Sequence, residues 1–117
     1  MRLEHYPPEK LKKEILTILE KHLDLGEYHV FFFGSRVAGN GTDVSDIDVG
    51  IEGPPISAQD WFGIQEEIHN LPILYTIDIV NFNEVAPSFR DVALQHIEQF
   101  TPDSANFFES FRNLSVD

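Results

Sequence analysis

Two aspartates, Asp46 and Asp48, are separated by a single apolar residue in the segment Ser45–Ile51, SDIDVGI. The apolar residues of this segment alternate with polar or small ones, which predicts a half-buried strand. Side chains two positions apart on a strand share a face, roughly 6.5 Å apart along the backbone, so both carboxylates project together. Carboxylates this close repel each other. Mg²⁺ (or Mn²⁺) would neutralise them and keep coordination sites for phosphate oxygens and water.

A possible anion site precedes this pair. Gly34, Ser35 and Arg36 follow the aromatic and β-branched run Val30–Phe33, which predicts a strand. A glycine and a serine between a strand and a helix present backbone N–H groups, a hydroxyl and a helix N-terminus to a phosphate. We expect Arg36 to add a charge-assisted contact. Read one at a time, these residues are ordinary turn and cap residues, but that reading explains neither the paired carboxylates nor the spacing.

A third carboxylate, Asp78, lies in the predicted strand Ile73–Val80. An aspartate in an apolar strand is costly to bury unless its charge is compensated. If the three strands are neighbours, Asp46, Asp48 and Asp78 converge on one side of a sheet, where metal ions would bridge them to phosphate oxygens. The alternative is an aspartate at an exposed sheet edge.

Three motifs together resemble the nucleotidyltransferases of the DNA polymerase β superfamily, and most closely their minimal, MNT-type members. They are GSRVAG at Gly34–Gly39, SDIDVGI at Ser45–Ile51 and IDIV at Ile77–Val80. The resemblance covers roughly Leu11–Phe100 and implies that the Gly-Ser pair binds nucleotide phosphates, that the first two aspartates hold divalent metal and that the third completes the site. Ala38 departs from the family pattern, in which a basic residue is common at this position.

The resemblance also implies a partner and a reaction. Minimal members are commonly paired with a small helical HEPN protein, a toxin ribonuclease that they neutralise, in some cases by attaching AMP from ATP to a tyrosine. The expected mechanism is an in-line attack of an acceptor hydroxyl on the α-phosphorus, with Asp78 deprotonating or positioning that hydroxyl. One alternative is a catalytically silent antitoxin that acts by occlusion. A different Asp-x-Asp metal enzyme, such as a sugar-nucleotide transferase, leaves Gly34 and Ser35 unexplained.

The other elements predict an α+β fold with a small mixed sheet of three to four strands and three to four flanking helices. Pro7-Pro8 opens a helix with an apolar stripe that Gly26 is expected to close, and its lysines are expected on a solvated face. Ser57 predicts the N-cap of a helix ending near Asn70, with Trp61 expected in or near the core rather than stacked on a base. Pro87 predicts a further helix, carrying Phe89, Val92, Ala93, His96 and Ile97 on one face.

The chain of 117 residues is expected to form a single domain, with residues 1–6 as a loose arm and 101–117 as a C-terminal extension. Three phenylalanines in that extension, Phe107, Phe108 and Phe111, predict an interface with a partner or with a second copy of the chain. Asp43 is expected in a turn.

The net charge of −12 bears on partners, because few basic residues follow the first predicted helix. An acidic surface of this kind disfavours nucleic acid as the acceptor and suits a basic protein. There is no cysteine, no apolar run of membrane-spanning length and no signal-peptide pattern, so a cytoplasmic protein that does not bind membranes is expected.

Overall fold

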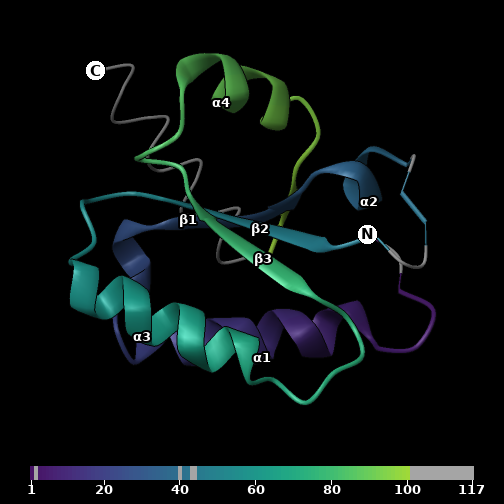
Figure 1. Cartoon of the computed structure of the whole chain (residues 1–117), viewed down its shortest axis with the longest axis horizontal. Helices are drawn as coiled ribbons and strands as arrows, with labels where there is room; N and C mark the ends of the chain where they lie inside the picture. The colour runs from purple at the N-terminus through teal and green to yellow at the C-terminus, as the bar shows by residue number, and fades with distance from the viewer. Residues whose placement is uncertain (2, 40, 43–44, 101–117) are drawn as a thin grey trace.

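The computed structural model describes residues 1, 3–39, 41, 42 and 45–100, and these form one mixed sheet with helices on both faces (Figure 1). The strands are β1 (His29–Phe33), β2 (Ile47–Glu52), β3 (Ile77–Asn81) and β4 (Glu98–Gln99), in the spatial order β3-β2-β1-β4. β1 runs antiparallel to β2 and to β4, whereas β2 and β3 are parallel. The predicted α+β fold is confirmed.

The sheet separates two groups of helices. α1 (Pro8–Glu20) and α3 (Ala58–His69) lie together on one face, and α4 (Pro87–Ala93) lies on the other (Figure 1). The helix α2 (Ser35–Ala38) is one turn between β1 and β2, and a 3-10 turn at Leu25–Glu27 precedes β1. No helix in the described ranges is both long and apolar enough to cross a membrane.

The helix starts follow the predicted signals. Pro8 opens α1, and the Ser57 hydroxyl accepts a hydrogen bond from the backbone N–H of Asp60 at 3.1 Å as the predicted cap of α3. The predicted closure of α1 by Gly26 is wrong. The helix ends at Glu20, and Gly26 lies in the 3-10 turn, where its N–H donates to the side chain of Asp24.

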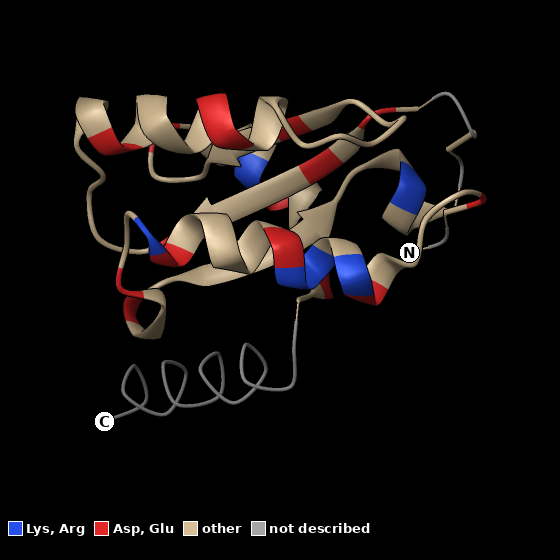
Figure 2. Ribbon diagram, turned by 90° about the horizontal axis from the view of Figure 1, so that it is seen from below, with Lys and Arg blue, Asp and Glu red and all other residues tan. Residues whose placement is uncertain are grey.

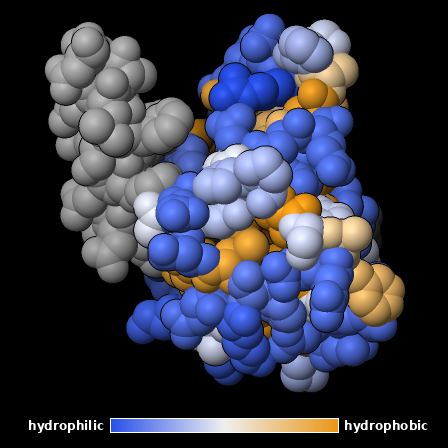
Figure 3. All heavy atoms as spheres, turned by 90° about the vertical axis from the view of Figure 1, so that its left-hand side faces the viewer, coloured by the Kyte–Doolittle hydropathy of each residue, from blue (hydrophilic) through white to orange (hydrophobic). Residues whose placement is uncertain are grey.

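The predicted solvated lysine face of α1 is confirmed for Lys10 and Lys13, which are exposed, but is wrong for Lys12. Lys12 is only 6% exposed, and its ammonium lies 3.1 Å from Glu98 and 3.2 Å from Glu9. Figure 2 shows basic residues gathered at a few places, several on α1, and acidic residues spread over many elements. In Figure 3 hydrophilic residues cover much of one face, with hydrophobic residues exposed between them.

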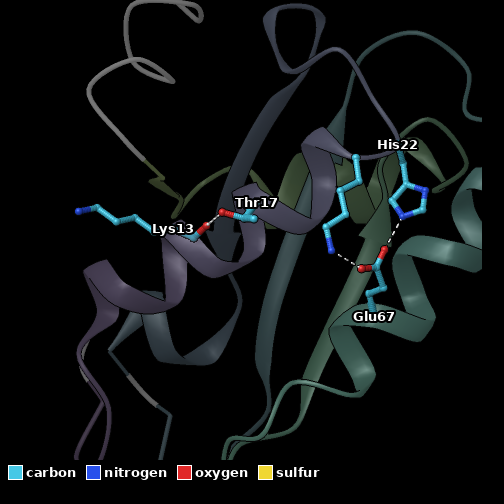
Figure 4. Close-up of polar contacts among 5 residues, drawn as sticks. Lys13, Thr17, His22 and Glu67 are labelled. Carbon is cyan, nitrogen blue, oxygen red and sulfur yellow. Dashed lines mark hydrogen bonds and ion pairs between the residues drawn. The ribbon is translucent and has the colours of Figure 1, made fainter.

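A polar cluster joins α1 to α3 at the surface (Figure 4). Glu67 of α3 accepts a hydrogen bond from the ammonium of Lys21 at 2.7 Å and pairs with the imidazole of His22 at 2.6 Å. The imidazole lies over Gly63, where an added Cβ would meet its Cε1 atom at 2.7 Å. The cluster therefore depends on a helix residue that has no side chain.

The larger core lies between the sheet and the α1–α3 layer. It contains the alternate apolar residues of all three long strands together with the buried stripes of α1 and α3, and Trp61 packs against it partly buried, as predicted. β3 begins at Ile77, later than the predicted Ile73, because residues 73–75 form a bend before the strand.

The smaller core lies on the α4 face and is aromatic. Phe31, Phe33 and Phe82 are its buried members. The ring of Phe31 lies directly over Gly50 of β2, where an added Cβ would meet its Cε2 atom at 2.4 Å and the Cε1 atom of Phe82 at 2.7 Å. The absence of a side chain at Gly50 thus lets two aromatic rings lie on the sheet. The predictions for Asp43, Phe107, Phe108 and Phe111 lie outside the described residues.

Candidate functional site

Asp48 and Asp78 are register partners on the parallel strands β2 and β3. The apolar neighbours of Asp48 on β2 point into the larger core, so the strand alternation turns both carboxylates to the α4 face. Both line one cavity, together with Gly34 and Ser35. The structure thus brings together four of the six predicted site residues.

Burial, the charge of Asp78 and the charge of Asp46, in that order, raise the pKa of Asp48 from 3.8 to about 6. A carboxyl group in this state is costly to ionise, and a bound cation would remove the cost. Carboxylate oxygens are also the donors that Mg²⁺ and Mn²⁺ prefer, so the residues present fit a hard divalent cation.

Within the described ranges, no three acidic, histidine or cysteine side chains gather closely enough to hold one metal ion. Asp46 precedes β2 and is exposed, and it is not among the cavity-lining residues, although its charge reaches Asp48. The carboxylates therefore form a partial site. A partial site suits Mg²⁺, which commonly takes its remaining ligands from substrate phosphates and water.

Gly34 is held against Asp48 by a backbone shape that excludes other residues. Its φ of 85° and ψ of −163° lie in a region that glycine alone adopts readily. A Cβ added there would lie 2.1 Å from Oδ2 of Asp48. The missing side chain thus lets the loop reach the carboxylate.

Ser35 begins α2 immediately after Gly34. The first N–H groups of a helix have no acceptor within it and are available to an anion. At four residues, α2 has only a small dipole, so any phosphate contact here depends on individual N–H groups and the serine hydroxyl.

The structure does not bring Arg36 into the cavity. Its side chain is 4% exposed, and Nε donates to the carbonyl oxygen of Ser45 at 2.9 Å. The guanidinium stacks over the ring of Tyr75 at 5.0 Å. Arg36 therefore joins α2 to the segments that lead into β2 and β3, whereas a phosphate contact was predicted.

The other lining residues come mainly from α4 and the turn after it. The cavity, of about 470 Å³, is also lined by Phe33, Ala38, Phe89, Val92, Ala93, Gln95 and His96. The predicted helix does start at Pro87, but His96 was expected to lie on its apolar face. α4 ends at Ala93, so His96 follows the helix, where it is exposed and lines the cavity. The only sequence signal for this side of the cavity was the apolar face of the predicted helix that became α4.

An ion pair fixes α4 to the sheet. Nε and Nη2 of Arg90 donate to the two carboxylate oxygens of Glu52, at the end of β2, at 2.7 and 2.9 Å. Glu52 lies 38 residues before Arg90 in the sequence, so this pairing depends on how α4 crosses the sheet. This two-point contact sets the position of the helix that forms the cavity wall.

Comparisons with known proteins identify the family and the fold. The sequence pattern described as "Polymerase beta, Nucleotidyltransferase" matches residues 13–101. Comparison with curated proteins gives no match. A solved structure described as a minimal nucleotidyltransferase is 23% identical, with a TM-score of 0.60, and covers 80% of this chain and 96% of its own.

Two further solved structures are toxin-antitoxin complexes. One, described as a toxin-antitoxin with AMP-PNP, is 13% identical with a TM-score of 0.60 and covers 90% of each chain. The other, a tri-AMPylated Shewanella oneidensis HEPN toxin in complex with MNT antitoxin, is 14% identical with a TM-score of 0.55 and covers 92% of this chain and 90% of its own. At these identities the likeness establishes the fold. From the sequence pattern and this fold, the chain belongs to the polymerase beta nucleotidyltransferase family.

Proposed function

We propose that the protein transfers AMP from ATP to a hydroxyl of a small helical HEPN-family toxin and thereby acts as its antitoxin in the cytoplasm. The observation that carries the proposal is the pairing of Asp48 with Asp78 in one cavity beside Gly34. Two structural neighbours support the substrate and the partner, because one holds AMP-PNP and another contains an AMPylated HEPN toxin.

Each site residue has a role in this proposal. The backbone at Gly34 and Ser35 binds the triphosphate, and Asp48 with Asp46 would hold Mg²⁺ or Mn²⁺. When bound, the divalent cation supplies positive charge against the phosphate oxygens. The raised pKa of Asp48 supports this assignment, because burial and the charges of Asp78 and Asp46 raise it and a bound cation would oppose all three.

Asp78 is the better placed carboxylate for the acceptor, because it is more exposed than Asp48. It orients the acceptor hydroxyl or takes its proton. The hydroxyl oxygen forms a bond to the α-phosphorus, the bond from that phosphorus to the bridging oxygen of the β-phosphate breaks, and pyrophosphate leaves with the electron pair. Positioning and charge stabilisation supply most of the rate in transfers of this kind.

The acceptor comes from another molecule in this scheme, because the described residues are taken up by one sheet and its covering helices. The net charge of −12 favours a basic partner surface and fast association with it. The same partner would also bind a silent antitoxin, so binding alone does not separate transfer from occlusion.

The test follows label from ATP. The protein is incubated with Mg²⁺, a candidate HEPN partner and ATP labelled at either the α- or the γ-phosphate, and toxin ribonuclease activity is measured in parallel. Asp78→Asn is compared with Asp91→Asn, which makes the same change at an exposed position of α4 that does not line the cavity.

We expect α-label, and no γ-label, on the partner. Asp78→Asn should lose the transfer and Asp91→Asn should keep it. Toxin inhibition without label from either position would overturn the proposal in favour of occlusion. Label from the γ-position alone would replace nucleotidyl transfer with phosphoryl transfer.

A further inference from the structure

The cavity wall formed by α4 is apolar and exposed, opposite the carboxylates. Phe89 is 45% exposed and Val92 67% exposed, and both line the cavity that contains Asp48 and Asp78. Exposed apolar side chains gathered in a cavity commonly mark a binding surface. The site therefore has a charged side and an apolar side.

Phe89 is held in place by other rings. Its ring centroid lies 6.2 Å from that of Phe33 at an interplanar angle of 86°, and 6.0 Å from that of Phe82 at 51°. Arg90, the next residue, pairs with Glu52 and holds the helix to β2. A supported ring that keeps nearly half of its surface exposed is a ready platform for a flat ligand.

We infer that this wall binds the nucleobase of the nucleotide whose phosphates lie at Gly34 and Ser35, an inference that rests on the proposed function. The two groups line one cavity of about 470 Å³, within the usual range for small-molecule sites. A nucleoside triphosphate likewise has a charged end and a flat, largely apolar end. Gln95 and His96 line the same wall and bring hydrogen-bond donors and acceptors suited to a base edge.

The test compares two ligands that differ in the nucleoside. Dissociation constants for ATP and for inorganic tripolyphosphate, each with Mg²⁺, are measured by calorimetry on the whole chain. Phe89→Leu keeps apolar volume against Phe33 and Phe82 but removes the flat ring, and Phe89→Ala removes both. Phe62→Leu is the matched control, because Phe62 is also exposed, at 64%, but belongs to α3 on the other face of the sheet.

Stacking of a base on an aromatic ring contributes about 1–3 kcal/mol, so the Phe89 variants should weaken ATP binding by roughly 5- to 150-fold. Tripolyphosphate binding should stay unchanged in them, and Phe62→Leu should change neither ligand. The nucleobase assignment is overturned if ATP binds no more tightly than tripolyphosphate to the unaltered protein, or if Phe89→Leu and Phe89→Ala leave ATP binding intact.

Two further results would locate the error. Unchanged ATP affinity with a raised KM for the HEPN partner in the Phe89 variants would overturn the nucleobase assignment and give this wall to the acceptor. If neither ATP nor tripolyphosphate binds the unaltered protein, the proposed function itself fails, and the nucleobase assignment fails with it. Binding of both ligands with no effect at Phe89 rejects the nucleobase site alone.

Discussion

Replacing Gly34 with alanine should separate the contact with Asp48 from ordinary backbone strain. Residues other than glycine in the conformation of Gly34 cost about 1–3 kcal/mol. The new Cβ would also lie 2.1 Å from Oδ2 of Asp48, closer than any stable contact, so the carboxylate must rotate away. Rotation into water relieves its burial, so we expect the clash to add little further loss of stability.

Gly39→Ala is the matched control. Gly39 also has a positive φ, 89°, but an added Cβ there meets nothing within 4 Å. It should lose a similar free energy of unfolding, about 1–2 kcal/mol, and leave Asp48 in place. Urea denaturation measures this loss for both variants.

The site readouts should then differ between the two variants. In Gly34→Ala the pKa of Asp48, followed by NMR of its carboxyl carbon, should return toward its ordinary value, and Mn²⁺ binding and label transfer should fall sharply. Gly39→Ala should keep all three properties. If Gly34→Ala keeps the raised pKa and binds Mn²⁺ as Gly39→Ala does, the close approach of the loop does not position the carboxylate.

Three further predictions concern charge and packing. Because the folded protein holds the proton of Asp48 more tightly than the unfolded chain does, the metal-free protein should lose stability as pH rises from about 4 to about 6. Asp48→Asn should remove this loss and be more stable than the unaltered protein above pH 6, measured by urea denaturation with EDTA. Hydrogen bonds from Lys21 and His22 lower the pKa of Glu67 below 4.5, so its stabilising effect should be present above that pH and fade as pH falls. The stability difference between the unaltered protein and Glu67→Gln should shrink on acidification; a constant difference would contradict this. Gly63→Ala should gain less than the roughly 1 kcal/mol expected in a helix, and the full gain should appear only in a His22→Ala background.

The carboxylates and the glycine loop were predictable because their signals are local. Alternation in the segment containing Asp48 sets its face. Asp78 was predicted from the cost of burying an aspartate in an apolar strand, whereas Asp78 is exposed on the edge strand β3. Parallel pairing of β2 with β3 then brings Asp78 beside Asp48. Asp46 was assigned to the strand itself, whereas β2 begins one residue later.

The other parts of the site depend on contacts distant in sequence. Arg36 turns inward because Tyr75, far along the chain, offers its ring face. Lys12 is buried because Glu98 lies on a two-residue strand too short to show any periodicity. The wall at Phe89 depends on where α4 crosses the sheet, which the helix pattern alone does not specify.

The ring of Phe31 over Gly50 has a consequence for how the chain chooses its strand alignment. A shift of β2 by one residue would turn Asp48 into the larger core, and the core itself resists that error. A shift by two residues keeps every face correct and would separate Asp48 from Asp78. It would also bring the side chain of Asp48 or Glu52 beneath the ring of Phe31, where there is no room even for a methyl group. Gly50 therefore helps to specify the register of β1 and β2, because a pairing shifted by two residues would clash with the ring of Phe31. A residue that takes no part in the chemistry thus helps to place the carboxylates of the candidate site.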